Sequence, residues 1–402
     1  MAKKKRITLL IDGEQYDQWL SGEVTRDLKD FSGSFSFTFR DGLRSMRSMK
    51  YASAGSPYKL RPGPEVIIRI DGRTVLKGWL EKVRPEISDR QASVTISGRD
   101  KSGDLIDCAA MKDVAEFNNV KLEEAAKRIV APFGMSVRSE IDTGEPFSRY
   151  SIDLAETGFS AIEKGARSRH ALVLSDGVGG VVITRTGATR APAHIVLPGN
   201  VLSSGAEYSH ENRFSETTVR GQGEKAGKER GKGKLDVTAE PIGAGDRNQS
   251  GGSATEQERR GTAATGRAKD DEITRYRPIV HLARSKADSV SAQDEADWRS
   301  RTARAESEEM TYSVKGFVAN GQLWAVNQLA YVSDAFQDVE RDMLISRTRF
   351  VEDSAGAITE LSVVSPEAFD KGPVGDRRKN KSSKAGKKAA GGGALDGTAS
   401  AL

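Results

Sequence analysis

Cysteine is almost absent from this chain of 402 residues, in which Cys108 is the only one. A single thiol excludes an internal disulfide and a thiolate metal cluster within one chain. We therefore expect synthesis in a reducing cytoplasm. Long apolar runs are lacking too: Ile7 to Ile11 is far shorter than a signal-peptide core, and no stretch approaches a membrane span. We expect a soluble protein that is not exported by the general secretory route.

Catalytic and metal-binding patterns are also scarce. The histidines are His170, His194, His210 and His281. No two of them have the i, i+4 spacing that places two imidazoles on one metal, and no Gly-x-Ser-x-Gly nucleophile motif occurs. Glu306, Glu308 and Glu309 end a predicted helix close to several arginines, which favours ion pairing over acid and base catalysis. Spacing alone leaves a catalytic triad open but unsupported, so we predict no enzyme activity, no metal site and no cofactor.

Aromatic residues make up 6% and hydrophobic residues 37% of the chain, which is lean for a fully folded protein of this length. The formal charge is +5, and the basic excess lies at the ends, in Met1 to Arg6 and Arg377 to Lys388. Solvated tails explain these runs, because short lysine runs bind phosphate weakly and no aromatic residues interleave them. We expect no sequence-specific binding of nucleic acid.

A glycine-rich stretch, Gly221 to Ala226, formally matches the dinucleotide-binding fingerprint after a predicted strand. That fingerprint needs a helix whose amino terminus holds the pyrophosphate. Further glycines follow at Gly227, Gly231 and Gly233, so no helix is expected there. We therefore predict no nucleotide site.

The amino-terminal hundred residues have the alternation of β-strands. Phe35, Phe37 and Phe39 alternate with small polar residues, which predicts that one face is buried. Asp71-Gly72 lies between two apolar runs and predicts a tight hairpin. The region is expected to form an antiparallel barrel or sandwich.

The middle of the chain changes to a helical pattern. Leu122 to Ile129 has helical spacing, and Pro132 and Gly134 are expected to end that helix. A second helix is predicted to start after the capping residue Thr157, and a hairpin is predicted around Asp176-Gly177. Strands are expected again from residue 195 onward.

Two distant stretches share one order of predicted elements. Val66 to Ser97 and Leu329 to Ser365 both show a strand, a turn, a longer strand, a turn and a strand. Their sequence identity is negligible, so common β-meander patterning explains the likeness about as well as duplication does. Trp79 and Trp324 lie within strand patterns and are expected to be core or interface anchors.

Four stretches carry a family resemblance: Gly63 to Gly72 with Lys77 to Glu81, Ile96 to Cys108, Phe159 to Arg167 with the hairpin ending at Gly187, and Leu323 to Asn327. Together they resemble the baseplate hub protein of Mu-like contractile phage tails, the tail protein P family. The resemblance runs from about residue 6 to 370, and its most specific part is Gly98-Arg-Asp-Lys101 with Asp104-Leu-Ile-Asp-Cys108.

The resemblance implies a structural protein of the virion tail baseplate, with a β-rich α+β multidomain fold. It implies two tube-type antiparallel β-barrel domains per chain and smaller α+β domains, assembled as a homotrimeric ring with a central channel. The ring would join the hexameric tail tube protein to the trimeric membrane-piercing spike protein, as the related hubs of T4-like phages and type VI secretion spikes do. Other baseplate proteins and a tape measure protein in the lumen are the further partners, and membrane contact is indirect, through the spike.

On this basis we expect the following domains: residues 1–103, a first tube-like barrel; 104–190, a small α+β domain with two helices and a hairpin; 191–220 with 273–370, a second tube-like barrel with a helix at 289–309; 221–272, a flexible glycine-rich charged insert; and 371–402, a flexible basic tail. The candidate barrel or interface positions are Phe35, Phe37, Phe39, Trp79 and Trp324. Two alternatives stay open: a tail-tip enzyme that degrades the cell wall, and a type VI secretion spike component.

Overall fold

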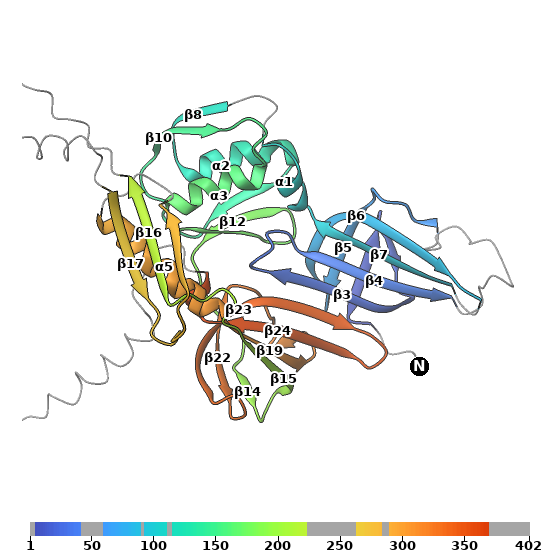
Figure 1. Ribbon diagram of the computed structural model, residues 1–402. Helices are drawn as coiled ribbons and strands as arrows, with labels where there is room; N and C mark the ends of the chain where they lie inside the picture. The colour runs from blue at the N-terminus through green and yellow to red at the C-terminus, as the bar shows by residue number, and fades with distance from the viewer. Residues whose placement is uncertain are drawn as a thin grey trace, which may run out of the picture. The chain divides into compact units, whose positions relative to one another are not determined.

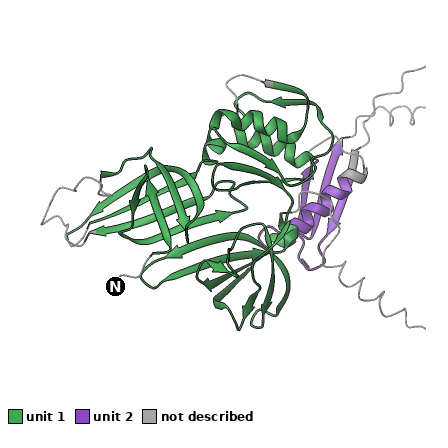
Figure 2. Ribbon diagram, turned by 180° about the vertical axis from the view of Figure 1, so that it is seen from behind, with its two compact units in different colours: residues 1–208, 305–372 green, residues 209–304, 373–402 purple. Residues whose placement is uncertain are grey.

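A computed structural model describes residues 5–41, 59–89, 92–110, 115–222, 263–283 and 289–369 (Figure 1). It contains two compact units: unit 1 is residues 1–208 with 305–372, and unit 2 is residues 209–304 with 373–402 (Figure 2). The predicted tail at 371–402 lies outside the described residues, and so do residues 223–262 of the predicted insert at 221–272.

The first module is the run of strands at the start of unit 1. Its strands are β1 (Ile7–Ile11), β2 (Glu14–Tyr16), β3 (Trp19–Asp27), β4 (Ser34–Asp41), β5 (Glu65–Ile70), β6 (Arg73–Ile87) and β7 (Ala92–Asp100). Side chains alternate between buried and partly exposed along β7, as the sequence pattern predicts. Asp71 and Gly72 both have positive φ, at 48° and 81°, which is the geometry of a two-residue hairpin. The predicted hairpin is confirmed.

The second module is the later run of strands in unit 1. Its main strands are β14 (Ile195–Leu197), β15 (Val201–Tyr208), β19 (Glu308–Lys315), β22 (Gln328–Asp334), β23 (Val339–Glu352) and β24 (Ala357–Val364). Its short elements are β13 (Thr189–Arg190), β20 (Val318–Ala319), β21 (Gln322–Leu323) and the 3-10 turn η3 (Pro366–Ala368).

The two modules share one continuous sheet. Its strand order is β15-β19-β24-β23-β3-β4-β7-β6-β5-β1-β2, and the modules meet where β23 pairs with β3. The first eight strands of this path, β15 to β6, are named the eight-strand run. Side chains from both modules form one buried cluster beneath it, including Phe37 and Tyr312, which are both 0% exposed. The buried apolar faces of both modules therefore stabilise one another.

A domain with helices and short strands, residues 103–184, lies between the two modules in sequence and is named the second domain. It contains α1 (Gly103–Asp107), β8 (Ala115–Val120), α2 (Leu122–Val130), η2 (Ala131–Phe133), β9 (Ser136–Ser139), β10 (Phe147–Ile152), α3 (Gly158–Ser168), β11 (Leu172–Ser175) and β12 (Gly180–Thr184). Gly134, at φ 65°, ends the first predicted helix, and the Thr157 side chain accepts a hydrogen bond from Ser160 N (3.3 Å) at the start of the second. Strands β11 and β12 pair antiparallel, which confirms the predicted hairpin.

Unit 2 is a small sheet with one helix. Its elements are β16 (Glu216–Gln222), β17 (Ala263–Lys269), β18 (Pro278–Leu282) and α5 (Ser289–Glu306), whose last two residues belong to unit 1. Strand β16 is central, antiparallel to β17 and parallel to β18. Ala292 and Ala296 of α5 pack against Val219 and Ala268, and Figure 2 shows the helix across one face of the sheet.

The expected closed barrels are not present within the described part of the chain. The path of paired strands stays open, from β15 at one end to β2 at the other. The reason is that β3, whose second edge would be needed for closure of the first module, pairs with β23 instead. A β-rich fold with several sheets is what the structure confirms.

The expected second barrel also differs in its boundaries. Residues 191–220 and 273–370 were expected together, but 209–304 clusters separately as unit 2, because β16 pairs with β17 and β18 rather than with β15 or β19. Strand β17 lies within the expected flexible insert at 221–272, so the last part of that stretch is an ordered strand. The polar composition had predicted no ordered structure there, but β17 is held by its backbone pairing with β16.

The predicted helix at 289–309 ends earlier, at Glu306. Glu308 and Glu309 belong to β19, where Glu308 lies opposite Tyr208 of β15. Their carboxylates form ion pairs with Arg341 (2.6 Å) and Lys29 (3.1 Å), respectively. The predicted ion pairing is confirmed for these two residues, with Arg341 and Lys29 as partners.

Candidate assembly interfaces

The joint between the modules is the antiparallel ladder that runs from Arg347 opposite Asp27 to Glu352 opposite Gly22. On its apolar face, Phe350 lies opposite Val24, and these side chains are 3% and 1% exposed. On its polar face, Arg349 forms ion pairs with Glu23 and with Glu360 (2.7 Å). An apolar contact on one face and charge pairs on the other hold the two modules edge to edge.

Glu352 fastens the first strand to this joint. Its carboxylate accepts hydrogen bonds from the backbone N–H groups of Arg6 (3.0 Å) and Ile7 (2.8 Å), and the residue is 8% exposed. Arg6 also forms an ion pair with Asp71 of the β5–β6 turn. Since a buried carboxylate is costly unless it is hydrogen-bonded, these donors make the position favourable.

The two modules repeat each other in strand register. The ladders that β4 forms with β3 and β7 match those that β19 forms with β15 and β24. By this match, Phe35, Phe37 and Phe39 correspond to Met310, Tyr312 and Val314. The match shows that the order of elements noted in the sequence reflects a shared three-dimensional register.

The irregularities of the ladders repeat as well. The β3–β4 ladder shifts at Leu20 and the β15–β19 ladder shifts at Leu202. The β6–β7 ladder shifts at Glu81 and the β23–β24 ladder shifts at Ser346. Bulges are specific features of a fold, so bulges at matching positions favour duplication over common β-meander patterning.

The joint is formed by β3 and β23. Each of these two strands has a counterpart at the matching position of the other module. Strand β15 is the counterpart of β3, and the last part of β6 is the counterpart of the last part of β23. In the part of the chain that the structure describes, neither counterpart pairs with a strand on the matching side. These two stretches, Val83–Ile87 and Ser204–Tyr208, are the free edges.

Exposure differs sharply between the joint and the free edges. Val24 and Phe350 are buried, whereas their counterparts Ala206 and Pro85 are exposed. Ile87 and Tyr208 are 45% and 58% exposed, although each lies on the face that packs into a core. The free edges therefore match the joint in register. Among the described residues, however, no partner strand covers the positions that are buried in the joint.

The second domain is anchored to the first module by Asp100, which is 1% exposed. Its carboxylate accepts hydrogen bonds from Ser32 Oγ (2.9 Å), Gly33 N (2.9 Å), Ser102 N (2.9 Å), Ser102 Oγ and Ser175 Oγ (3.0 Å). One carboxylate thus fastens the β3–β4 loop, the start of α1 and the β11–β12 hairpin together. This is a physical reason for aspartate in the Gly-Arg-Asp-Lys stretch.

Arg26 reinforces the same contact from β3. Its guanidinium donates hydrogen bonds to the backbone carbonyls of Ser175 and Asp176, the latter at 2.9 Å. Burial lowers the pKa of Arg26, and the nearby charges of Asp100 and Asp176 oppose that shift. The charge of this arginine is therefore balanced inside the contact.

Two glycines allow β6 and β7 to approach closely beside this anchor. A Cβ atom at Gly78 would lie 1.9 Å from the carbonyl oxygen of Arg99, and one at Gly98 would lie 2.0 Å from that of Trp79. The same stretch holds Arg99, which forms ion pairs with Glu81 (2.9 Å) and Asp107. The hydrogen bond from Arg99 lowers the pKa of Asp107.

Trp79 belongs to this anchor and not to the main core. Its indole Nε1 donates to Asp104 Oδ2 (3.1 Å), and the Lys101 Nζ atom lies 5.5 Å from its ring centroid. Lys101 in turn forms an ion pair with Glu65 (3.1 Å). The half-buried Trp79 therefore links the first module to α1.

The other predicted positions lie together in the main core. Phe35, Phe37 and Phe39 are 3%, 0% and 3% exposed, and Trp324, which follows β21, is 3% exposed. All four belong to the core cluster shared by the modules. Sequence reasoning missed the free-edge residues, such as Pro85 and Ala206, because exposed small residues have no periodic signal.

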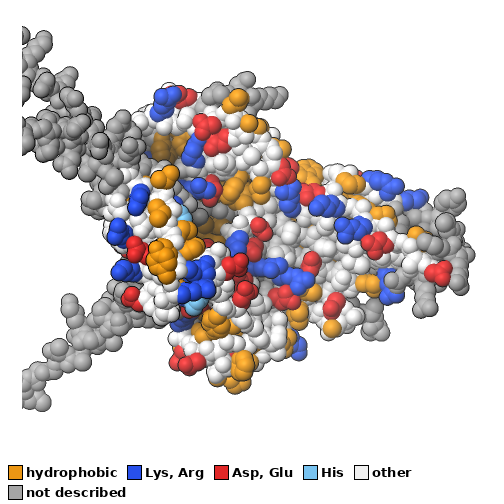
Figure 3. All heavy atoms as spheres, viewed as in Figure 1, with side chains coloured by type: hydrophobic (Ala, Val, Ile, Leu, Met, Phe, Trp, Pro, Cys, Tyr) orange, Lys and Arg blue, Asp and Glu red, His pale blue; other side chains and the backbone are white. Residues whose placement is uncertain are grey.

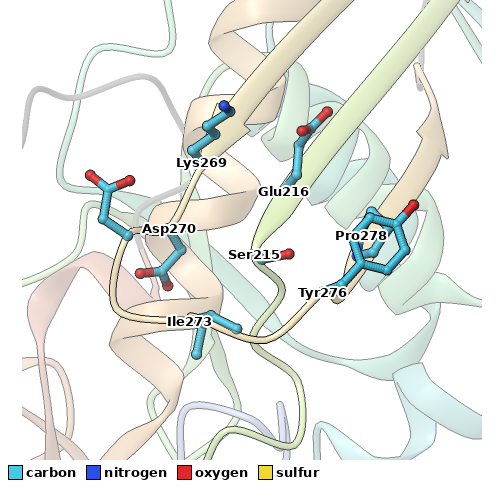
Figure 4. Close-up of a pocket in the computed structure, with 8 residues that line it drawn as sticks. Ser215, Glu216, Lys269, Asp270, Ile273, Tyr276 and Pro278 are labelled. Atoms are coloured by element: carbon cyan, nitrogen blue, oxygen red, sulfur yellow. The ribbon is translucent and has the colours of Figure 1, made fainter.

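Unit 2 has a shallow hollow of about 300 Å³ at the ends of its strands (Figure 4). Its lining residues are Ser215, Glu216, Lys269, Asp270, Asp271, Ile273, Tyr276 and Pro278. One lining residue, Asp270, forms an ion pair with Arg213 at 2.8 Å, and their side chains are 5% and 4% exposed. The carboxylate of Asp270 thus holds the fold of the loop.

The sheet of unit 2 also presents exposed apolar side chains. Tyr276, Val280 and Leu282 are 91%, 57% and 81% exposed along and before β18. Figure 3 shows hydrophobic side chains beside lysines and arginines in this unit. Among the described residues, no group of His, Cys, Asp and Glu is arranged to hold a metal, and no helix is long and apolar enough to cross a membrane.

Comparisons with known proteins agree on one family. Three family models match in order: "Mu phage baseplate assembly protein GpP-like, N-terminal" at residues 6–100, "Baseplate hub protein gp44-like, second domain" at 102–185, and "Mu phage baseplate assembly protein GpP, fourth domain" at 288–372. The chain is 30% identical over 381 residues to baseplate hub protein gp44 of Escherichia phage Mu, covering 93% of this chain and 91% of that protein.

Solved structures show the same fold. The 43 kDa tail protein of prophage MuSo2 from Shewanella oneidensis is 28% identical, with a TM-score of 0.72 over 90% of this chain and 99% of that one. A tail protein from Neisseria meningitidis MC58 is 19% identical, with a TM-score of 0.67 over 91% of this chain and 98% of that one. The chain therefore belongs to the baseplate hub protein family of Mu-like phages and is a structural component of the phage tail baseplate.

Proposed function

We propose that three copies of this chain close a ring by repeating the joint between chains. The observation that carries the proposal is the pair of free edges, whose register and bulges match those of the joint. Two modules per chain give six in three copies, which suits a hub that links a hexameric tube to a trimeric spike. Closure leaves no exposed edge in the eight-strand run.

The register of the joint specifies the contacts of the proposed interface. When the register of the joint is applied to the free edges, Pro85 lies opposite Ala206 on the apolar face. On the same face, Val83 lies opposite Tyr208. The register also places Arg84 opposite Glu207 on the polar face. Apolar contacts on one face and an ion pair on the other repeat the chemistry of the joint.

In the closed ring, the polar face of the sheet lines the central channel. The apolar face of the eight-strand run packs on the core with β1, β5 and β22, so the opposite face turns toward the ring axis. Its residues are small and hydroxylic or charged, as in the cross-strand row of Ser97, Ser36 and Glu23. Such a face suits passage of a polymer, because it offers few apolar contacts.

The partners follow from this role. We propose the tail tube protein and the spike protein as axial neighbours, other baseplate proteins around the ring, and a tape measure protein in the lumen before DNA passes. Contact with a membrane is through the spike alone. The single exposed Cys108 fits synthesis in the host cytoplasm, followed by incorporation into the virion.

A catalytic role has less support. The relatives are named as baseplate hub and baseplate assembly proteins, which favours a non-enzymatic hub over a tail-tip enzyme. The three matching family models are all phage baseplate models, which favours a phage hub over a type VI secretion spike component.

A charge exchange tests the proposed interface. Arg84→Glu places two carboxylates opposite each other in every interface, which costs about 0.5–1 kcal/mol per contact and weakens association cumulatively. Glu207→Arg does the same with two guanidinium groups, and the double variant restores an opposite pair. We expect sedimentation to show dissociation of each single variant at concentrations where the double variant stays associated.

The control is Arg149→Glu, in the second domain and far in sequence from either free edge. Its association should equal that of the unchanged chain. Equal association of all four variants would contradict the proposed pairing of β6 with β15.

A further inference from the structure

Phe336 is an exposed aromatic residue on a turn whose backbone is held in place. The turn joins β22 to β23, and Phe336 is 81% exposed. The carboxylate of Asp334, a residue 2% exposed, accepts hydrogen bonds from Phe336 N (2.8 Å) and Gln337 N (3.1 Å). The same carboxylate accepts from the hydroxyl of the buried Tyr312 (2.9 Å). A buried acceptor therefore fixes the turn while its aromatic side chain stays exposed.

The turn lies beside the free edge of β15. The hydroxyl of Tyr208, the last residue of that edge, donates to Gln337 Oε1 (3.4 Å). Tyr208 is itself 58% exposed. Single exposed apolar side chains are common on protein surfaces, but this aromatic residue adjoins the strand that pairs with the next chain in the proposed ring.

The first module has a counterpart of this turn at Asp71-Gly72. Strand β5 lies next to β6 in the sheet as β22 lies next to β23. Asp71 forms an ion pair with Arg6, and Asp71 N donates to Arg6 O (3.0 Å). Arg6 N in turn donates to the carboxylate of Glu352, the last residue of β23 (3.0 Å). At the joint, the turn and the start of β1 therefore cover the end of the strand from the other module.

The counterpart of Glu352 is Ile87, the last residue of β6. Glu352 is 8% exposed and has its donors, whereas Ile87 is 45% exposed on the matching face. A buried carboxylate needs hydrogen-bond donors, but an isoleucine needs an apolar contact. The two turns differ in the same way, because one carries Asp71 and the other carries Phe336.

We propose that Phe336 packs on Ile87 of the next chain, as a second contact beside the ladder of β6 with β15. The inference rests on the proposed ring and names the residues that close each interface between chains at its end. An aromatic side chain on a fixed turn loses little freedom on binding, which suits an anchor of an interface.

The contact also distinguishes the interface between chains from the joint within a chain. The joint ends in a carboxylate with its donors, and the interface ends in two apolar side chains. An exchange of partners would place Glu352 against Phe336, which offers no side-chain donor, and Ile87 against charged groups. Each edge is thereby matched to its own partner.

Cross-linking of the full-length chain tests the contact. In a Cys108→Ser background, Ile87→Cys and Phe336→Cys are introduced together, and a short bismaleimide joins thiols that lie close to each other. A second pair, Pro85→Cys with Ala206→Cys, tests the ladder in the same way. We expect both pairs to give covalent trimers in denaturing electrophoresis. Each single-cysteine variant is the control, because one thiol per chain cannot give a covalent trimer.

The two pairs separate the contact from the ring. Trimers from the ladder pair without trimers from residues 87 and 336 would overturn the contact and leave the ring intact. Absence of trimers from the ladder pair would count against the ring itself, on which the contact rests.

Truncation of the aromatic ring measures its share in association. We expect Phe336→Ala to weaken association in sedimentation by roughly tenfold or more, because it removes the anchor but no backbone hydrogen bond of the turn. Leu154→Ala, at a residue 77% exposed in the second domain, is the matched control and should leave association unchanged. Equal association of the two variants would contradict the role of Phe336.

Discussion

Asp100 joins three segments of the chain through a single buried carboxylate. Its partners include backbone and side-chain donors from the β3–β4 loop, the start of α1 and the β11–β12 hairpin. Since buried donors from each segment use this one carboxylate as an acceptor, it stabilises all three segments at once. Its effect is local to the contact between the first module and the second domain.

The substitution Asp100→Ala should lower the free energy of unfolding by about 3–5 kcal/mol, because it leaves several buried donors without an acceptor and removes a negative charge near Arg26. Ser32→Ala is the matched control, since it removes a single donor and should cost about 1 kcal/mol. Chemical denaturation followed by tryptophan fluorescence measures both values. A loss for Asp100→Ala no larger than that for Ser32→Ala would contradict this role.

Glu65 and Asp107 make the same contact sensitive to acid. Burial raises the pKa of Glu65, but hydrogen bonds from Lys101 and Lys77 outweigh it and hold this pKa below its ordinary value of 4.5. Arg99 holds the pKa of Asp107 below 3.8. A depressed pKa means that the unfolded chain binds protons first, so the stability from these carboxylates is complete above the ordinary values and is lost as pH falls through the folded values.

We therefore expect the melting temperature to decline as pH falls below about 4.5. Part of that decline should disappear in Glu65→Gln, which has no carboxylate to protonate. Thermal melts of both proteins between about pH 6 and pH 3 measure the difference. A difference between the two proteins that does not change with pH would show that Glu65 gains no stability from its lysine partners.

At the scale of elements, the sequence predicted strands where apolar alternation is regular. The phenylalanines of β4 predicted that strand and its buried face, and Thr157 predicted the start of α3. Strand β3 was not predicted, because the bulge at Leu20 places Trp19 and Gly22 on the same face and breaks the two-residue period. The strand that forms the joint therefore has the least regular pattern.

The candidate interfaces were harder to predict for a related reason. Phe35, Phe37 and Phe39 were expected at barrel or interface positions, and they lie in the core. The free edges are made by exposed residues such as Arg84 and Ala206, which look like ordinary surface residues in a sequence. Only the register of the ladders shows that they correspond to buried positions of the joint.

The close approach of β6 and β7 leads to a prediction for Gly98. Gly98→Ala would place a Cβ atom 2.0 Å from the Trp79 carbonyl oxygen, so the strands must separate, and we expect a loss of about 1–3 kcal/mol in the free energy of unfolding. Gly205→Ala is the control, because nothing lies within 4 Å of its Cβ position. Equal stability of both variants in denaturant titrations would contradict the packing at β7.

At the scale of the whole molecule, the chain repeats one module and joins its two copies by a sheet edge. In the proposed ring, the free edges of separate chains pair as the joint does, with the same register and the same division into an apolar and a polar face. A closed sheet built in this way resists separation, because each contact between modules is a backbone ladder.

The central claim is that three chains form the ring through the pairing of β6 with β15. Sedimentation equilibrium of the purified full-length chain at micromolar concentration tests it most directly. The ring predicts one species with the mass of three chains, which Arg84→Glu shifts toward a folded monomer. A chain that stays monomeric under these conditions, or a trimer that Arg84→Glu and Glu207→Arg both leave unchanged, would contradict it.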